Sequence, residues 1–149
     1  MDDMRSTANV LNELLDLHAE RRPGDNALTD GTEHLTWREY RDRAASLGGA
    51  LRQIGVQVGD RVAIHLSKSV DSFVAVHAIL RLGATVVPID WFAPAAHVRN
   101  VIADADPTAM ISSASKRVLD DLVGDSEGPP VIGPAASGPP IDRVDVAPG

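Results

Sequence analysis

The order of apolar and polar residues predicts a helix near the amino terminus. Apolar side chains recur there at helical spacing on one face, and two arginines precede a Pro-Gly pair. Cations suit the last turn of a helix, and proline and glycine interrupt it, so we expect one amphipathic helix. The residues on the face are Val10, Leu11, Leu14, Leu15 and His18, and the closing residues are Arg21, Arg22, Pro23 and Gly24.

A short hairpin and a second helix are predicted next. Two short runs, 27–30 and 33–36, flank the turn-forming pair Asp30-Gly31. Thr36 and Glu39 have the spacing of a capping box, in which each side chain accepts one backbone N–H at the start of a helix. Gly55 suits the left-handed position that ends this helix. Its apolar face consists of Tyr40, Ala44, Leu47, Leu51 and Ile54.

Three later runs have the composition of buried strands. Residues 61–66, 85–89 and 108–111 are rich in apolar and β-branched side chains that scarcely alternate with polar ones. Pro88 is expected at the end of its strand, because proline cannot donate to the ladder.

Helical patterns separate and follow these strands. Ser69 is placed to cap a helix that ends before Gly83 and is apolar almost all round, so we expect it to be buried. Pro94 suits the first turn of the next helix, and 116–123 forms a last short one. Alternating strands and helices imply right-handed crossovers, hence an α/β fold with a parallel sheet and helices on its faces.

The composition changes after the last predicted helix. Glycine and proline dominate residues 124–149, and no apolar periodicity remains. We therefore expect one domain over residues 1–123, followed by a flexible, disordered tail over 124–149.

Charge and composition narrow the class of protein. The 149 residues are 44% hydrophobic and carry a net charge of −7. Such a chain can bury one core, but it is not built to neutralise phosphates, so we expect no nucleic-acid partner. The sequence has no cysteine, no signal-peptide pattern and no apolar run of the roughly 18 residues that span a bilayer. We expect a cytoplasmic protein without a membrane partner.

Common catalytic motifs are absent from the sequence. It contains neither the Gly-x-x-x-x-Gly-Lys-Ser/Thr phosphate loop nor the Gly-x-Gly-x-x-Gly fingerprint nor the Gly-x-Ser-x-Gly elbow. No two histidines have the i, i+4 spacing that places two imidazoles on one metal, so we expect no metal site. The histidines are His18, His34, His65, His77 and His97.

The remaining polar candidates are expected to have structural roles. His65 and His77 fall on apolar segments and are expected to be core histidines hydrogen-bonded to neighbours. Asp104 and Asp106 do not face each other on a helix and are expected to end it. The Arg21-Arg22 pair complements a helix C-terminus, with anion binding as a weaker alternative.

The serines after the third predicted strand and the aromatic residues are also expected to have structural roles. Ser112, Ser113 and Ser115 are expected to cap the following helix. Trp91 and Phe92, at a strand end, either line the rim of a pocket or pack in the ordinary way. The larger aromatic set is too dispersed to stack nucleic-acid bases, and it consists of Trp37, Phe73, Trp91 and Phe92.

Four stretches together resemble the opening of a known superfamily. They are Leu-Thr-Trp-Arg-Glu-Tyr at 35–40, Gly-Val-Gln-Val-Gly-Asp-Arg-Val-Ala-Ile at 55–64, Leu-Arg-Leu-Gly-Ala-Thr-Val-Val-Pro-Ile-Asp at 80–90 and Ile-Ala-Asp-Ala-Asp-Pro at 102–107. In this order they resemble the adenylate-forming superfamily, which includes acyl-CoA synthetases and the adenylation domains of non-ribosomal peptide synthesis. The first is similar to the family's Leu-Thr-Tyr-x-Glu-Leu motif and the third to its Leu-Lys-Ala-Gly-Ala-x-x-Val-Pro-Ile-Asp motif.

The resemblance implies chemistry with ATP and magnesium. Similar enzymes convert a carboxylic or amino acid to an acyl-AMP, and a thiol of coenzyme A or of a carrier protein then takes the acyl group. Their phosphate loop and catalytic lysine follow later in the chain. Ser137-Gly138-Pro139-Pro140 lacks the continuation of that loop and its lysine, so we assign no catalytic, cofactor-binding or metal-binding residue.

Three interpretations follow. The first is an N-terminal portion of an adenylate-forming ligase, inactive alone, whose remainder is missing or supplied by a second chain. Within this interpretation, the sequences of residues 66–70 and 91–101 slightly favour a ligase that activates an amino acid or another small acid. The second is a degenerate, non-catalytic α/β module that binds a protein through a sheet edge or a bare apolar face. The third, an unrelated α/β binding domain, requires the motif matches to be accidental.

Overall fold

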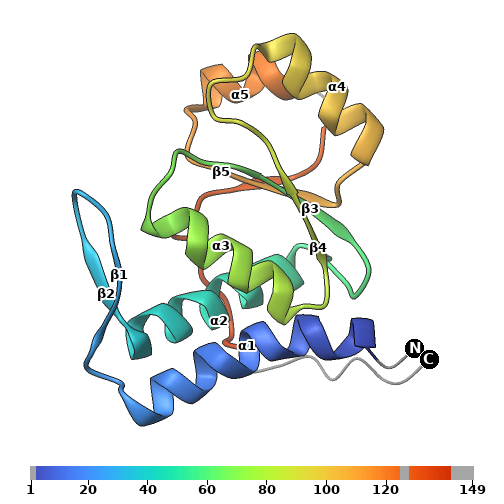
Figure 1. Cartoon of the computed structure of the whole chain (residues 1–149). Helices are drawn as coiled ribbons and strands as arrows, with labels where there is room; N and C mark the ends of the chain where they lie inside the picture. Colours follow the sequence, from blue (N-terminus) through green and yellow to red (C-terminus); the bar gives the residue numbers. More distant parts are fainter. Residues whose placement is uncertain (1–2, 125–127, 142–149) are drawn as a thin grey trace.

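The computed structural model describes residues 3–124 and 128–141 and confirms the predicted α/β class. Its larger sheet is parallel, in the order β4-β3-β5-β6, and an antiparallel hairpin, β1-β2, stands apart from it. Figure 1 shows α1, α2 and α3 on one side of the larger sheet and α4 and α5 on the other. The elements are α1 (Asp3–Arg21), β1 (Asn26–Thr29), β2 (His34–Thr36), α2 (Trp37–Gln53), β3 (Arg61–His65), α3 (Val70–Arg81), β4 (Thr85–Pro88), α4 (Ala95–Ala105), β5 (Ala109–Ser112), α5 (Lys116–Val123) and β6 (Val131–Ile132).

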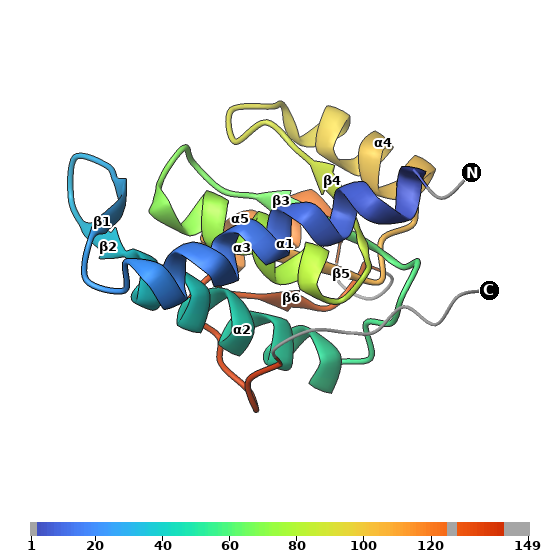
Figure 2. The same ribbon diagram turned by 60° about the horizontal axis from the view of Figure 1, so that its bottom comes forward.

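The first helix packs on α2 and α3 as the outermost layer (Figure 2). Helix α1 begins earlier than the apolar pattern indicated, and the face that it buries differs from the predicted one. Leu15 and Ala19 are buried, whereas Leu11 and Leu14 are each 46% exposed. Asp16 forms an ion pair with Arg81 of α3 on the buried side. The predicted apolar face is therefore only partly the packing face.

The start of α2 follows the predicted capping box. The Glu39 N–H donates to Thr36 Oγ1 (3.3 Å), and the Thr36 N–H donates to Glu39 Oε2 (2.8 Å). Two orphan donors at the helix start are thereby satisfied. The helix ends at Gln53, and Gly55 follows with a φ of 102°, which a residue with a side chain rarely adopts. Both ends of this helix agree with the prediction.

Two hydrophobic cores lie on the two faces of the sheet. Successive residues of β3 point to opposite faces, so Val62 and Ile64 join the core beneath α2 and α3, whereas Ala63 joins the core beneath α4 and α5. Met110 and Val98 are fully buried in this second core. The near-continuous apolar runs of β3 and β5 reflect burial on both faces.

Strand β4 differs from the prediction of a buried strand. It is an edge strand, paired only with β3 among the described strands, and its residues are exposed or half-buried. Pro88 ends it, as predicted. Helix α3 is also less buried than its composition indicated, because Phe73 is 50% exposed. Apolar composition alone did not distinguish a central position from an edge.

The prediction of a disordered tail over 124–149 is wrong for residues 128–141. Strand β6 pairs in parallel with β5, in the register Met110↔Val131 and Ile111↔Ile132. Further on, Ile141 is only 7% exposed and packs against α2, and its N–H donates to the Ala45 carbonyl (3.2 Å). Residues 125–127 and 142–149, also part of the predicted tail, lie outside the described residues.

Candidate functional site

The carboxyl ends of β3 and β5 form the topological switch point of the sheet. The chain leaves β3 for α3 on one face and leaves β5 for α5 on the other, although the two strands are neighbours. In open parallel sheets, ligands bind in the crevice outside such a point. His65 is the last residue of β3 and lies in register with Ser112, the last residue of β5.

His65 and Ser112 are hydrogen-bonded to each other at this edge. His65 Nδ1 lies 3.0 Å from Ser112 Oγ, which also accepts the Ala114 N–H (3.1 Å). The Trp91 ring lies against the imidazole, with centroids 4.7 Å apart. Burial lowers the pKa of His65, although a hydrogen bond to the Trp91 backbone opposes this shift.

The contacts of this pair give it a structural role. His65 and Ser112 are only 3% and 4% exposed, so neither meets solvent as a nucleophile or base would. The expectation of a hydrogen-bonded core histidine at position 65 is confirmed. The expectation that Ser112 caps the next helix is wrong, because Ser115 occupies the N-cap of α5 and accepts the Val118 N–H (3.5 Å).

An open apolar groove of about 440 Å³ lies beside the switch point. It runs between α3, the edge strand β4 and the loop after β4, and Lys68 and Asp90 are the charged residues on its wall. Trp91 and Phe92 line this groove, so of the two roles considered for this aromatic pair the structure shows the pocket rim. The main apolar residues of the wall are Phe73, Val76, Val86, Pro88, Trp91 and Phe92.

The loop at the end of the groove is held in a defined turn. Asp90 Oδ1 accepts the Phe92 N–H (2.9 Å), and the Asp90 carbonyl accepts the Ala93 N–H (3.1 Å). Stacking on His65 fixes the preceding Trp91. Phe92 is nevertheless 88% exposed. Its ring is therefore presented to solvent by an ordered turn.

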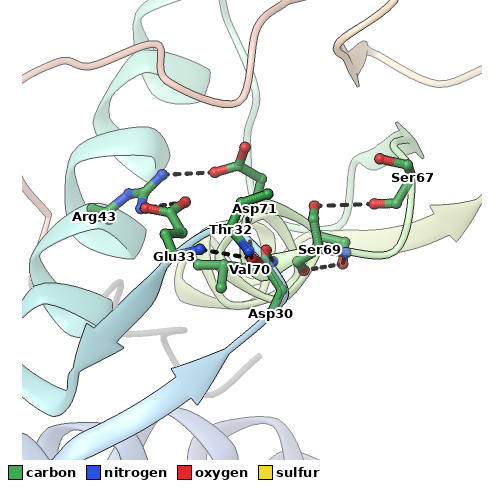
Figure 3. Close-up of polar contacts among 9 residues, drawn as sticks. Asp30, Thr32, Glu33, Arg43, Ser67, Ser69, Val70 and Asp71 are labelled. Carbon is green, nitrogen blue, oxygen red and sulfur yellow. Dashed lines mark hydrogen bonds and ion pairs between the residues drawn. The ribbon is translucent and has the colours of Figure 1, made fainter.

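Hydrogen bonds fasten the hairpin to the start of α3 (Figure 3), and α3 forms the other wall of the groove. Asp30 Oδ2 accepts the Val70 N–H (2.8 Å), and Asp30 Oδ1 accepts the N–H groups of Thr32 and Glu33. These bonds hold the pKa of Asp30 well below its usual range, the bond to Val70 having the largest effect. Arg43 Nη2 donates to Asp71 Oδ1 (2.6 Å).

Two predictions about polar residues of α3 and the loop before it need revision. Ser69 is the N-cap of α3, as predicted, but its hydroxyl donates to the Ser67 carbonyl (3.0 Å). His77 packs edge-on against Tyr40, with centroids 5.1 Å apart, but its buried Nδ1 has no hydrogen-bond partner among the described residues. The expectation of a hydrogen-bonded histidine is therefore wrong at position 77.

The remaining candidates do not converge on one site. His34 and His97 are exposed on separate elements, and no group of three or more His, Asp or Glu in the described part of the chain is arranged to hold a metal ion. His18 packs against Trp37, with centroids 4.5 Å apart, and Arg22 lies over the same indole at 5.8 Å. Asp106 is the C-cap that ends α4, as predicted, and its backbone is left-handed, whereas Asp104 lies within the helix.

Sequence reasoning missed the buried ion pair between Asp16 and Arg81. The Arg81 side chain is only 1% exposed. Little in the sequence indicated that Arg81 is buried, because an arginine in the last turn of a helix is ordinarily explained by its interaction with the helix dipole. A buried charge needs a partner, and α1 supplies it. No helix in the described segments is long and apolar enough to cross a membrane.

Comparison with known proteins identifies the family. The fold and the switch-point edge define a doubly wound α/β protein with a parallel sheet. The sequence matches the AMP-binding enzyme family over residues 15–138, and the chain belongs to that family. The match extends beyond residue 123, where the predicted domain ended, and includes β6.

The relatives are considerably longer than this chain. Enterobactin synthase component F of Escherichia coli (strain K12) is 34% identical over 104 residues, which are 70% of this chain and 8% of the relative. The putative acyl–CoA ligase YdaB of Bacillus subtilis is 33% identical over 98 residues, which are 65% of this chain and 20% of YdaB. The crystal structure of VinN superposes with a TM-score of 0.74 at 26% identity, over 82% of this chain and 31% of VinN.

Proposed function

We propose that this chain forms the N-terminal portion of an adenylate-forming ligase, which activates a carboxylic or amino acid as an acyl-AMP. The supporting observation is the family match over residues 15–138, together with a fold that superposes on 31% of VinN. In this proposal the portion is inactive alone and needs the remainder of the ligase fold for activity. The complete enzyme acts in the cytoplasm.

ATP and magnesium are assigned to the remainder of the enzyme in this proposal. The carboxyl edge of the sheet does not fit a nucleotide, because Trp91 covers His65 and Ser112 is buried there. The sequence has no lysine-bearing glycine-rich loop. Phosphoryl and adenylyl chemistry requires backbone donors and cations around the phosphates, so we derive no catalytic step from the residues of this chain.

The proposed acceptor is a thiol of a carrier protein or of coenzyme A. The relatives include both a synthase component and a putative acyl–CoA ligase, so they support either acceptor. VinN has also been solved in complex with L-aspartate, at 25% identity to this chain, which supports an amino acid among the substrates to be tested.

Pyrophosphate release tests the proposal. The chain would be assayed with ATP, magnesium and a panel of amino, aryl and fatty acids, alone and after co-expression with the part of VinN outside its match to this chain. Release that depends on both polypeptides and on the acid is the expected result. Release by the chain alone would refute its proposed inactivity, and failure to release pyrophosphate with the VinN part would count against the proposed role in an adenylate-forming ligase.

A second candidate function is a non-catalytic protein-interaction module. The exposed apolar groove with Phe92 at its end favours it, since such surfaces on soluble domains commonly bind other proteins. This candidate would gain support if the chain were a stable monomer and the VinN part neither bound it nor gave activity. Sedimentation velocity of the purified chain measures the first of these conditions.

A further inference from the structure

From the contacts between α1 and α3, we propose that the docking of α1 is sensitive to protons through His77. The helix is docked while the imidazole is neutral, and protonation of the imidazole favours its release from α2 and α3. Helix α1 is suited to such a motion because it forms the outermost layer of the molecule (Figure 2). The proposal concerns conformation and is independent of the proposed ligase activity.

The side of α1 that packs on the domain contains polar as well as apolar residues. Leu15 and Ala19 are each 3% exposed. Asp16 forms an ion pair with Arg81 of α3. Asn12 lies one turn before Asp16 and is 5% exposed, but its Oδ1 has no hydrogen-bond partner among the described residues. A buried polar atom without a partner costs free energy, so α1 is docked less tightly than its apolar residues alone would allow.

His77 lies one turn before Arg81 on α3, close to this ion pair. Its ring packs edge-on against Tyr40 of α2, and its buried Nδ1 has no hydrogen-bond partner among the described residues. A neutral imidazole needs only one donor satisfied, whereas an imidazolium has two N–H donors and a full charge. Burial of that charge without partners is costly, so the docked state disfavours protonation.

Charged groups of α1 and α3 act on His77 in opposite directions. Burial and the positive charge of Arg81 lower the pKa of His77, and the Asp16 carboxylate of α1 opposes this shift. The carboxylate is already paired with Arg81, which limits how far it can stabilise a second cation. The docked state therefore binds this proton more weakly than a state in which the imidazole meets water.

Among the described residues, the other elements packed on α3 supply no further counter-charge to the imidazole. Tyr40 of α2 is neutral near pH 7, because burial raises the pKa of its phenol. Arg43 of α2 is a cation and is held by Asp71 in the first turn of α3 (2.6 Å). The residues of β3 on this face of the sheet are apolar, and β4 contains no ionisable residue. Asp16 is thus the carboxylate on which the effect depends.

The direction of the pH effect follows from proton linkage. A histidine in water has a pKa of about 6.5, and the state that binds the proton more strongly is favoured as the pH falls. Docking of α1 is therefore complete above about pH 6.5 and weakens below it. One proton changes the docking equilibrium by at most about tenfold per pH unit. Between about pH 7.5 and 5.5 we expect a change of about five- to tenfold.

Hydrogen exchange of the full chain, measured by mass spectrometry of its peptides at these two pH values, provides the test. Exchange rates are converted to protection factors, which removes the intrinsic effect of pH on exchange. Peptides from α1 report its release, and peptides from β3 and β5 report unfolding of the whole domain. His77→Gln and His77→Phe both remove the titrating group, and the second keeps a ring against Tyr40. His18→Gln removes the histidine of α1 that packs on Trp37 and is the matched control.

Protection of α1 should fall by about five- to tenfold at the lower pH in the wild-type chain and in His18→Gln, with β3 and β5 unchanged. In both His77 variants the fall should be less than about twofold. Constant protection of α1 in the wild-type chain would overturn the proposal, as would a fall that persists in a folded His77 variant or disappears in His18→Gln. Loss of protection in β3 and β5 together with α1 would also overturn it, because the whole domain would then open.

Discussion

The effect of Gly49→Ala on stability tests whether residues 138–141 pack against helix α2. Gly49 lies in the middle of α2, where glycine is less favourable than alanine by about 1 kcal/mol. A Cβ at this position would lie 2.0 Å from the Pro139 carbonyl oxygen and 3.0 Å from the Gly138 carbonyl carbon. These are backbone atoms that no side-chain rotation can move, so Gly49→Ala forces residues 138–141 off the helix.

The expected magnitude follows from the contacts of that segment. Undocking breaks the bonds from Gly138 to the Ser46 carbonyl (3.1 Å) and from Ile141 to the Ala45 carbonyl (3.2 Å). Each contributes about 0.5–1.5 kcal/mol net, and burial of Ile141 about 1.5–3 kcal/mol. The freed backbone regains entropy, but Pro139 and Pro140 restrict that gain. We expect docking to be worth about 1–3 kcal/mol.

A double-mutant cycle measures this coupling. Urea unfolding followed by circular dichroism would be applied to the full chain and to a chain ending at residue 137, each with and without the Gly49→Ala substitution. In the shortened chain, Gly49→Ala should stabilise by about 1 kcal/mol, as helix propensity predicts. In the full chain the gain should be lost, with a coupling of about 1–3 kcal/mol. Equal stabilisation of both chains would refute the docked position of residues 138–141.

Gly48→Ala is the matched control for this cycle. Its Cβ would lie 2.9 Å from Ile141 Cδ1, the end of a flexible side chain, and 3.3 Å from the Ala78 carbonyl oxygen. A side-chain end can move aside where a backbone carbonyl cannot. The coupling to residues 138–149 should therefore be smaller for Gly48→Ala than for Gly49→Ala. A larger coupling at position 48 would contradict this geometry.

Three further substitutions test the core and the titrating groups. Leu51→Ala removes a fully buried side chain and should lower the free energy of unfolding by about 2–5 kcal/mol in a urea titration. Burial lowers the pKa of His65, so its contribution to stability is complete above about pH 6.5 and lost as the pH falls below it. Stability measured between about pH 7 and 5 should therefore depend less on pH in His65→Gln. Hydrogen bonds lower the pKa of Asp30, so its contribution is present above about pH 4 and lost as the pH falls through the folded pKa. Asp30→Asn should flatten stability below that pH and speed hydrogen exchange at the Val70 amide, and unchanged exchange would contradict the contact.

Local sequence signals predicted the elements whose causes are local. The capping box at Thr36 and Glu39 depends on two residues three apart, and the structure has both of its bonds. The left-handed turn at Gly55 and the end of β4 at Pro88 likewise follow from the restrictions of single residues. The βαβ alternation was readable because each strand and helix is an apolar segment of suitable length.

Features that depend on distant residues were not predictable in this way. The edge position of β4 is decided by strand order, which leaves no mark on the strand itself. Ser112 bonds to His65 because two strands 47 residues apart end in register. One usable signal was overlooked: Gly48 and Gly49 in a buried helix lower its propensity, so some backbone had to approach closely. Residues 138–139 provide that approach at Gly49, whereas Gly48 faces the Ile141 side chain and the Ala78 carbonyl.

The polar groups best suited to chemistry in the described residues are already engaged in holding the fold. His65 is held by Ser112 and Trp91, Asp30 accepts N–H groups from its own turn and from α3, and Arg81 is paired with Asp16. A group committed to such contacts cannot bind a substrate without breaking them. The chemistry of the proposed enzyme is therefore expected to come from the remainder of the ligase fold, and this portion contributes an ordered sheet edge whose polar groups are already paired.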